Sequence, residues 1–160
     1  MKKLPIIGIS VLLALAGCMT NMPPFEAGTA GSPRKVLVAG EDTAFKRSVV
    51  ARVIEKLGTQ DWYFRIIGLD QLPAQDTRQY GAIMLLAHFW GGKIDERVTN
   101  YLKQDPANRK VVLLYTRGTE DPLPGSVRPD LRVDAVSSAS RDDRVEMRAQ
   151  ELAALLAKRF

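Results

Sequence analysis

The 160-residue chain contains one cysteine, Cys18, and one histidine, His88. One cysteine cannot close a disulfide within the chain. One histidine leaves at most one candidate for a His-based zinc site or for the base of a Ser-His-Asp triad. The sequence also lacks a Walker loop, a nucleophile elbow and the spacing of a metal-ligand motif. These absences favour a protein that is not an enzyme.

The chain also has only a small excess of basic over acidic residues. The formal net charge is +5, from 23 basic and 18 acidic residues. Lys2 and Lys3 belong to the amino-terminal segment, and without them 21 basic residues face the same 18 acidic ones, a charge of about +3. No basic stripe with interleaved aromatic residues occurs, so we expect no nucleic-acid partner.

A long apolar run occurs at the amino terminus, over residues 4–16. It follows the two lysines and ends in the sequence LAGC, residues 15–18. This order of charge, apolar segment and small residues is typical of a secretory signal. Thirteen residues are too few to span a bilayer as a mature helix.

The LAGC segment resembles the lipobox of bacterial lipoproteins. The resemblance implies that residues 1–17 are removed as a signal peptide, and that Cys18 carries diacylglycerol on its sulfur and an acyl chain on its new amino group. The alternative is an ordinary signal peptide with a chance cysteine. Met19, rather than Asp, follows the cysteine, which in enteric lipoproteins favours the outer membrane. We therefore expect a lipid-anchored protein of the bacterial cell envelope, facing the periplasm.

Residues 18–34 are rich in Pro, Gly, Thr and Ser and show little apolar periodicity. Such a composition predicts a flexible tether between the lipid and a folded domain. The domain is then expected to occupy residues 35–160.

Within residues 35–160 strand-like and helix-like patterns alternate. Short apolar runs predict strands, and apolar residues three or four apart predict helices. The expected strands cover residues 35–40, 62–69, 80–87, 110–116 and 131–138, and the expected helices cover 43–57, 93–102 and 141–159. Gly58 is expected to end the first helix. This alternation predicts an α/β fold of three layers, with a five-stranded parallel sheet in the order 2-1-3-4-5.

The domain resembles the flavodoxins over most of residues 35–160. The best match is residues 80–104, YGAIMLLAHFWGGKIDERVTNYLKQ, followed by 109–118, RKVVLLYTRG. Flavodoxins have a strand ending in a loop with an aromatic residue and glycine, then a helix, then a strand ending in Thr-x-Gly. The resemblance implies the fold and raises FMN as a cofactor.

In flavodoxins the first strand runs into a loop whose hydroxyl and N–H groups bind the FMN phosphate. The matching stretch here is AGEDTAF, in which Gly40 and Thr43 fit that pattern. Glu41 and Asp42 depart from it, because a carboxylate about 4 Å from a phosphate charge repels it by about 4 kcal/mol at an effective dielectric constant near 20. Alternatively, Asp42 caps the helix that begins at Thr43 while Glu41 points into solvent. Both interpretations fill the anion site with the protein's own charge.

Three aromatic residues support the opposite interpretation. Phe89 and Trp90 lie where flavodoxins stack an aromatic ring on the flavin, and Tyr115 ends the fourth strand. They could stack on FMN, or they could pack against the sheet and the neighbouring loops. The sequence therefore predicts a lipid-anchored binding or scaffold module for an envelope protein partner, without FMN. An FMN-binding electron carrier at the membrane is the alternative, with Gly40, Thr43, Phe89, Trp90 and Tyr115 as its cofactor site.

Overall fold

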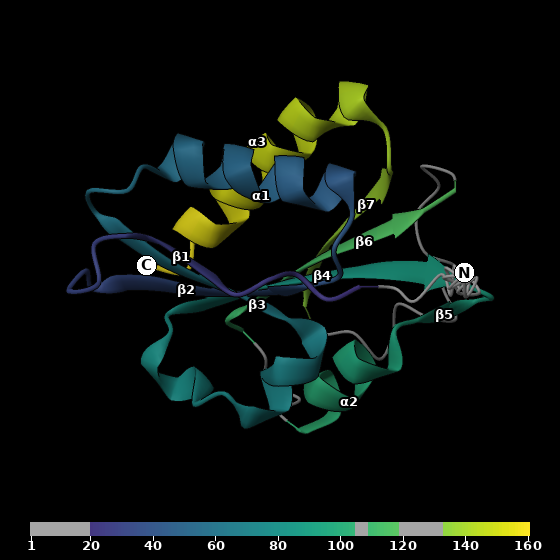
Figure 1. The fold of residues 1–160 in the computed structure, drawn as a ribbon, viewed down its shortest axis with the longest axis horizontal. Coiled ribbons are helices and arrows are strands. Elements are labelled where there is room, and N and C mark those ends of the chain that lie inside the picture. The colour runs from purple at the N-terminus through teal and green to yellow at the C-terminus, as the bar shows by residue number, and fades with distance from the viewer. Residues whose placement is uncertain (1–19, 105–108, 119–132) are drawn as a thin grey trace, which may run out of the picture.

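A single open sheet with helices on both faces forms the structure, a computed structural model that describes residues 20–104, 109–118 and 133–160 (Figure 1). The helices α1 (Ala44–Leu57) and α3 (Val145–Ala157) lie side by side on one face. The other face carries α2 (Glu96–Gln104) and the short 3₁₀ helices η1 (Leu69–Ala74) and η2 (Thr77–Gln79). The three-layer α/β prediction is therefore confirmed.

The five predicted parallel strands are all present. They are β2 (Arg34–Gly40), β3 (Trp62–Gly68), β4 (Ala82–Trp90), β6 (Val111–Arg117) and β7 (Asp134–Ala139). Their spatial order is β3-β2-β4-β6-β7, which is the predicted 2-1-3-4-5 order. Two antiparallel strands are added to them: β1 (Phe25–Gly28) beside β3, and β5 (Lys93–Ile94) beside the end of β4.

Burial on both faces explains why the strands read as nearly continuous apolar runs. In β2, Val36 and Val38 pack under α1 and α3, whereas Leu37 and Ala39 pack on the side of α2 and η1. Because successive side chains point to opposite faces, one apolar strand supplies both cores.

The helix after β2 begins and ends where the sequence predicts. The Thr43 hydroxyl accepts a hydrogen bond from the backbone N–H of Lys46 at 3.2 Å, which caps α1. Gly58 follows the helix with a φ of 81°, and its N–H donates to the carbonyl of Ile54 at 2.9 Å.

The structure departs from the sequence prediction where β4 ends. This strand continues to Trp90 and turns through Gly91 and Gly92 into β5, so the predicted loop is a hairpin. Both glycines have positive φ, 59° and 81°, as a two-residue turn of the primed type requires. The helix expected from residue 93 consequently begins at Glu96.

The prediction of a flexible tether over residues 18–34 is wrong for the part that the structure describes. Phe25–Gly28 pairs with β3 as a strand. Met22 is 3% exposed and joins the core under α1, and its N–H donates to the carbonyl of Gly40 at 3.0 Å. The segment is rich in proline and glycine, so its composition predicts a loop and does not reveal the four-residue edge strand within it. Residues 1–19, with the predicted signal peptide and Cys18, lie outside the described residues.

We expect Met22→Ala to lower the free energy of unfolding by about 2–4 kcal/mol, because it removes a buried side chain and leaves a cavity. The matched control is Met147→Ala, since Met147 is 40% exposed, and it should shift stability by less than about 0.5 kcal/mol. Urea unfolding of both variants measures the difference. Equal, negligible effects would mean that this segment is a tether after all.

Candidate functional site

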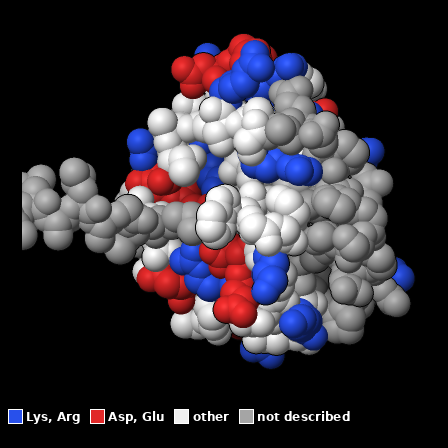
Figure 2. Space-filling model, turned by 90° about the vertical axis from the view of Figure 1, so that its right-hand side faces the viewer, with Lys and Arg blue, Asp and Glu red and all other residues white. Residues whose placement is uncertain are grey.

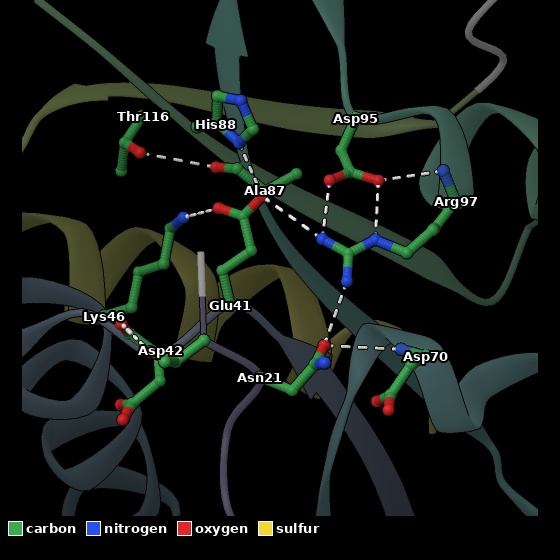
Figure 3. A network of polar contacts seen from close by, with 11 residues as sticks. Asn21, Glu41, Asp42, Lys46, Asp70, Ala87, His88, Asp95, Arg97 and Thr116 are labelled. Carbon is green, nitrogen blue, oxygen red and sulfur yellow. Dashed lines mark hydrogen bonds and ion pairs between the residues drawn. The ribbon is translucent and has the colours of Figure 1, made fainter. Parts of the chain in front are cut away.

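A buried ion pair lies at the carboxyl end of β2. Glu41 is 2% exposed and Lys46, on the first turns of α1, is 0% exposed. The Nζ of Lys46 donates to Oε2 of Glu41 (Figure 3). Burying a lysine and a glutamate at this depth is costly unless the charges are paired, and here each is a partner of the other.

The predicted roles of the two acidic residues after β2 are therefore corrected. Glu41 does not point into solvent; it points inward to Lys46. Asp42 does not cap α1, since Thr43 does, and the Asp42 carboxylate instead pairs with the guanidinium of Arg47. Both interpretations of Glu41 and Asp42 placed charges of the protein itself at this turn, and the structure shows such charges there.

Two more side chains converge on Glu41 from other elements, and a third, Asp95, joins them through Arg97. Nδ1 of His88, on β4, lies 2.5 Å from Oε1 of Glu41, and Nη2 of Arg97 lies 3.7 Å from the same oxygen. Since a carboxylate accepts, the Nδ1 of His88 carries the proton in this contact. Arg97 also binds Asp95 with two parallel hydrogen bonds, of 2.9 and 2.7 Å (Figure 3). The cluster of Glu41, Asp95, Lys46 and Arg97 thus holds two anions and two cations.

The pKa values reflect this mutual neutralisation. The guanidinium of Arg97 lowers the pKa of Asp95 to about 2, so Asp95 is ionised at any physiological pH. Burial lowers the pKa of Lys46, and the contact with Glu41 opposes that effect. Both cations of this cluster, Lys46 and Arg97, are paired with carboxylates. A phosphate placed here would therefore have to displace a carboxylate to gain a cationic partner.

The amino-terminal segment also covers the turn after β2. The N–H of Asp42 donates to the carbonyl of Thr20 at 2.6 Å, and the N–H of Glu41 donates to the carbonyl of Leu86 at 3.1 Å. Asn21 lies across the turn, where its side-chain oxygen accepts from Arg97 at 3.0 Å (Figure 3). The N–H groups of Glu41 and Asp42, which could bind an anion in an open loop, therefore have acceptors within the chain.

Gly40 has a packing role in this arrangement. A Cβ atom built there would lie 2.9 Å from Cβ of Leu86 and 3.2 Å from Sδ of Met22. The glycine thus lets β4 and the amino-terminal segment approach β2 closely. Its use in binding FMN stays a prediction, as does that of Thr43.

Glu41, His88 and Asp95 also have the donor types of a metal site. Their ligand atoms lie within 4.8 Å of one another. However, Lys46 and Arg97 occupy carboxylate oxygens of Glu41 and Asp95. A metal ion would have to displace both cations, so the arrangement fits a closed ion-pair cluster better than a metal centre.

An open cleft of about 440 Å³ lies beside this cluster, at the carboxyl ends of β4, β6 and β7. Its lining includes Phe89, Trp90, Arg117, Ser140 and Arg141. The Arg117 guanidinium lies 5.1 Å from the centre of the Phe89 ring. A cleft with aromatic and cationic walls can accept a flat or anionic molecule.

The three predicted aromatic residues have different environments. The rings of Phe89 and Tyr115 are 6.4 Å apart, but Tyr115 is 3% exposed and belongs to the core on the α2 side. Phe89 is half-buried, and Trp90, at the hairpin, is 81% exposed. Phe89 and Trp90 thus line the cleft, whereas Tyr115 offers little free ring surface.

Sequence reasoning missed Lys46, Asp95 and Arg97. One signal was available for Lys46, because it shares the apolar face of α1 with Val49, Val50 and Val53, where a lysine needs a buried anion. Asp95 and Arg97 gave only the local pattern of an acidic residue at a helix start. Their approach to Glu41 depends on tertiary structure.

No protein-family model matches this chain, and no curated protein matches its sequence. Solved structures do resemble it. A flavodoxin from the domain Archaea superposes with a TM-score of 0.56 at 12% identity, covering 78% of this chain and 98% of that one. A flavo-diiron protein from Thermotoga maritima superposes with a TM-score of 0.50 at 12% identity, covering 82% of this chain and 36% of that one. The chain therefore has a flavodoxin-like fold; similarity at this identity shows the fold alone.

We expect Lys46→Met to lower the free energy of unfolding by about 3 kcal/mol, because it leaves Glu41 buried without its nearest cation. The double variant Glu41→Leu with Lys46→Met removes both charges and should recover most of that loss. Arg52→Met, which breaks the exposed pair with Glu55 on the same helix, is the control and should change little. A double variant no more stable than Lys46→Met would contradict the pairing.

Proposed function

We propose that this protein is a lipid-anchored component of the bacterial cell envelope whose flavodoxin-like domain has lost the FMN phosphate site and serves as a binding or scaffold module. The observation that carries the loss of the site is the buried Glu41–Lys46 pair at the turn after β2. In this pair the Glu41 carboxylate lies beside the start of α1, where a flavodoxin-like site would bind a phosphate.

Two further observations support this proposal. The backbone N–H of Asp42 is taken by Thr20, so the amino-terminal segment lies over the turn. Asp42 adds a second carboxylate, paired with Arg47, at the same place. A phosphate at this turn would have to compete with the Glu41 and Asp42 carboxylates for Lys46 and Arg47, which already pair with them.

The lipid anchor is supported by the lipobox-like residues 15–18, with Cys18 as the lipidated residue. No helix among the described residues has both the length and the apolarity to cross a bilayer. Attachment to the membrane through Cys18 would place the domain at the periplasmic face, and Met19 favours the outer membrane. An envelope protein is then the expected partner, with no role for nucleic acid.

An FMN-binding electron carrier is the second candidate function. The cleft favours it, because Phe89 and Trp90 present aromatic surface there and the guanidinium of Arg117 lies over the Phe89 ring. FMN bound in this way would rely on its ring rather than on a phosphate loop.

An FMN titration of residues 20–160, which include the amino-terminal segment now known to be part of the fold, separates the two candidates. We expect no binding at about 1 μM FMN, equivalent to about −8 kcal/mol, by flavin fluorescence and calorimetry at low salt. A flavodoxin titrated in parallel is the positive control. Binding at that level, reduced by Trp90→Ala or Phe89→Ala, would replace the scaffold proposal with the electron carrier.

The anchor is tested separately with Cys18→Ser in the full chain. We expect the parent protein to partition into the detergent phase with a mass that shows cleavage before Cys18 and added acyl chains. The Cys18→Ser protein should stay uncleaved at that site and carry no lipid, because the thioether needs the sulfur. A parent protein without lipid would show that residues 1–17 are an ordinary signal peptide.

A further inference from the structure

The feature that carries the inference is the position of Thr20, the first described residue. Its carbonyl accepts from Asp42, and its hydroxyl donates to the Asp42 carbonyl at 3.3 Å. Asn21 forms an antiparallel bridge with Glu41, and Met22 is buried beside Gly40. The chain is therefore fixed to the domain from Thr20 onward, at the carboxyl ends of the strands.

We call this edge the rim: Thr20 and Asn21, residues 41–43, the β4–β5 hairpin with Trp90, and residues 116–118 and 139–141. Figure 2 views the molecule from this side, and its described acidic and basic residues lie above, below and to the left of a central group of uncharged ones. We propose that the rim rests on the lipid bilayer and that Trp90 enters the headgroup layer. This inference rests on the proposed lipid anchor at Cys18.

Covalent reach limits how far the domain can stand from the anchor. Only Met19 separates Thr20 from Cys18, so the Cα atoms of Thr20 and Cys18 are at most about 7 Å apart. The headgroup layer on each side of a bilayer is about 5–8 Å thick. Thr20, held this close to a lipidated residue, lies at the membrane surface whatever path Met19 takes.

Trp90 projects from the rim towards the same level. In the parallel register Gly40 of β2 lies beside Leu86 of β4, so β4 runs four residues, about 13 Å, past that point. Thr20 binds Asp42, two residues past Gly40. The hairpin that carries Trp90 therefore extends past the end of β2, at the same edge of the sheet where Thr20 is bound.

The chemistry of the hairpin fits a membrane interface. Trp90 is 81% exposed, and tryptophan is enriched where bilayers meet water. Exposed Lys93 follows the turn, and Arg117 lies over the neighbouring Phe89. Cations beside an exposed aromatic side chain suit a surface of lipid phosphates. An exposed tryptophan on a two-glycine turn has no evident role in the core.

The test uses the full lipidated chain, purified in detergent from bacterial membranes and reconstituted into vesicles of phosphatidylethanolamine and phosphatidylglycerol. Trp62 and Trp90 are the two tryptophans, and Trp62 is 5% exposed at the start of β3, at the opposite edge of the sheet. The emission of Trp90 is the difference between the parent and Trp90→Phe. We expect brominated lipids to quench Trp90 but not Trp62, and acrylamide to lose access to Trp90 when the protein enters vesicles.

A spacer variant is the matched control. Ten Gly and Ser residues inserted between Met19 and Thr20 add about 17 Å of flexible chain and leave every described contact intact. This variant should float with vesicles as the parent does, yet lose most of the lipid quenching of Trp90.

The outcomes separate the anchor from the orientation. Flotation of the parent but not of Cys18→Ser, with Trp90 open to acrylamide and unaffected by brominated lipid, would overturn the rim orientation and leave the anchor standing. Failure of the parent to float would overturn both. Protection of Trp90 in native envelope membranes but not in vesicles would assign the rim to a protein instead.

Discussion

The ion pair between Glu41 and Lys46 is the contact on which the arrangement of the rim depends. It holds the turn after β2 against α1, and Glu41 also contacts His88 on β4 and Arg97 on α2. Arg97 in turn binds Asn21, which holds the amino-terminal segment across the turn. Charges buried at this depth cost several kcal/mol each unless they are paired, so the cluster specifies one arrangement of five elements.

This cluster also changes what the flavodoxin-like scaffold can do. The carboxyl edge of a parallel sheet is where such folds bind ligands, because helix starts and strand ends leave polar groups unpaired there. In this chain those groups are satisfied internally beside β2, while the cleft beside β4, β6 and β7 stays open and aromatic. If the rim faces a bilayer, a protein partner would have to approach the helical faces, where α1 and α3 on one side and α2 on the other are accessible.

The fold was largely predictable, because its strands and helices produce regular patterns of apolar residues along the sequence. Apolar runs such as residues 111–117 and the four-residue spacing of Phe45, Val49 and Val53 gave the strands, the first helix and the sheet order. The site was less predictable. Glu41 and Asp42 were identified as unusual, but the burial of Glu41 against Lys46 and the contact of Asp42 with Thr20, 22 positions earlier, depend on tertiary structure. The edge strand Phe25–Gly28 carries no periodicity, since three of its four residues face solvent.

The amino-terminal strand has a mechanical consequence. In a domain attached through a flexible linker, a force on the amino-terminal end first extends the linker, and little of that force reaches the folded domain. Here the load reaches the Asn21–Glu41 bridge and the buried Met22 side chain at once, next to the ion-pair cluster. Tension at this end would therefore be felt first by the turn after β2, and the domain would yield from its rim inward rather than from its far edge.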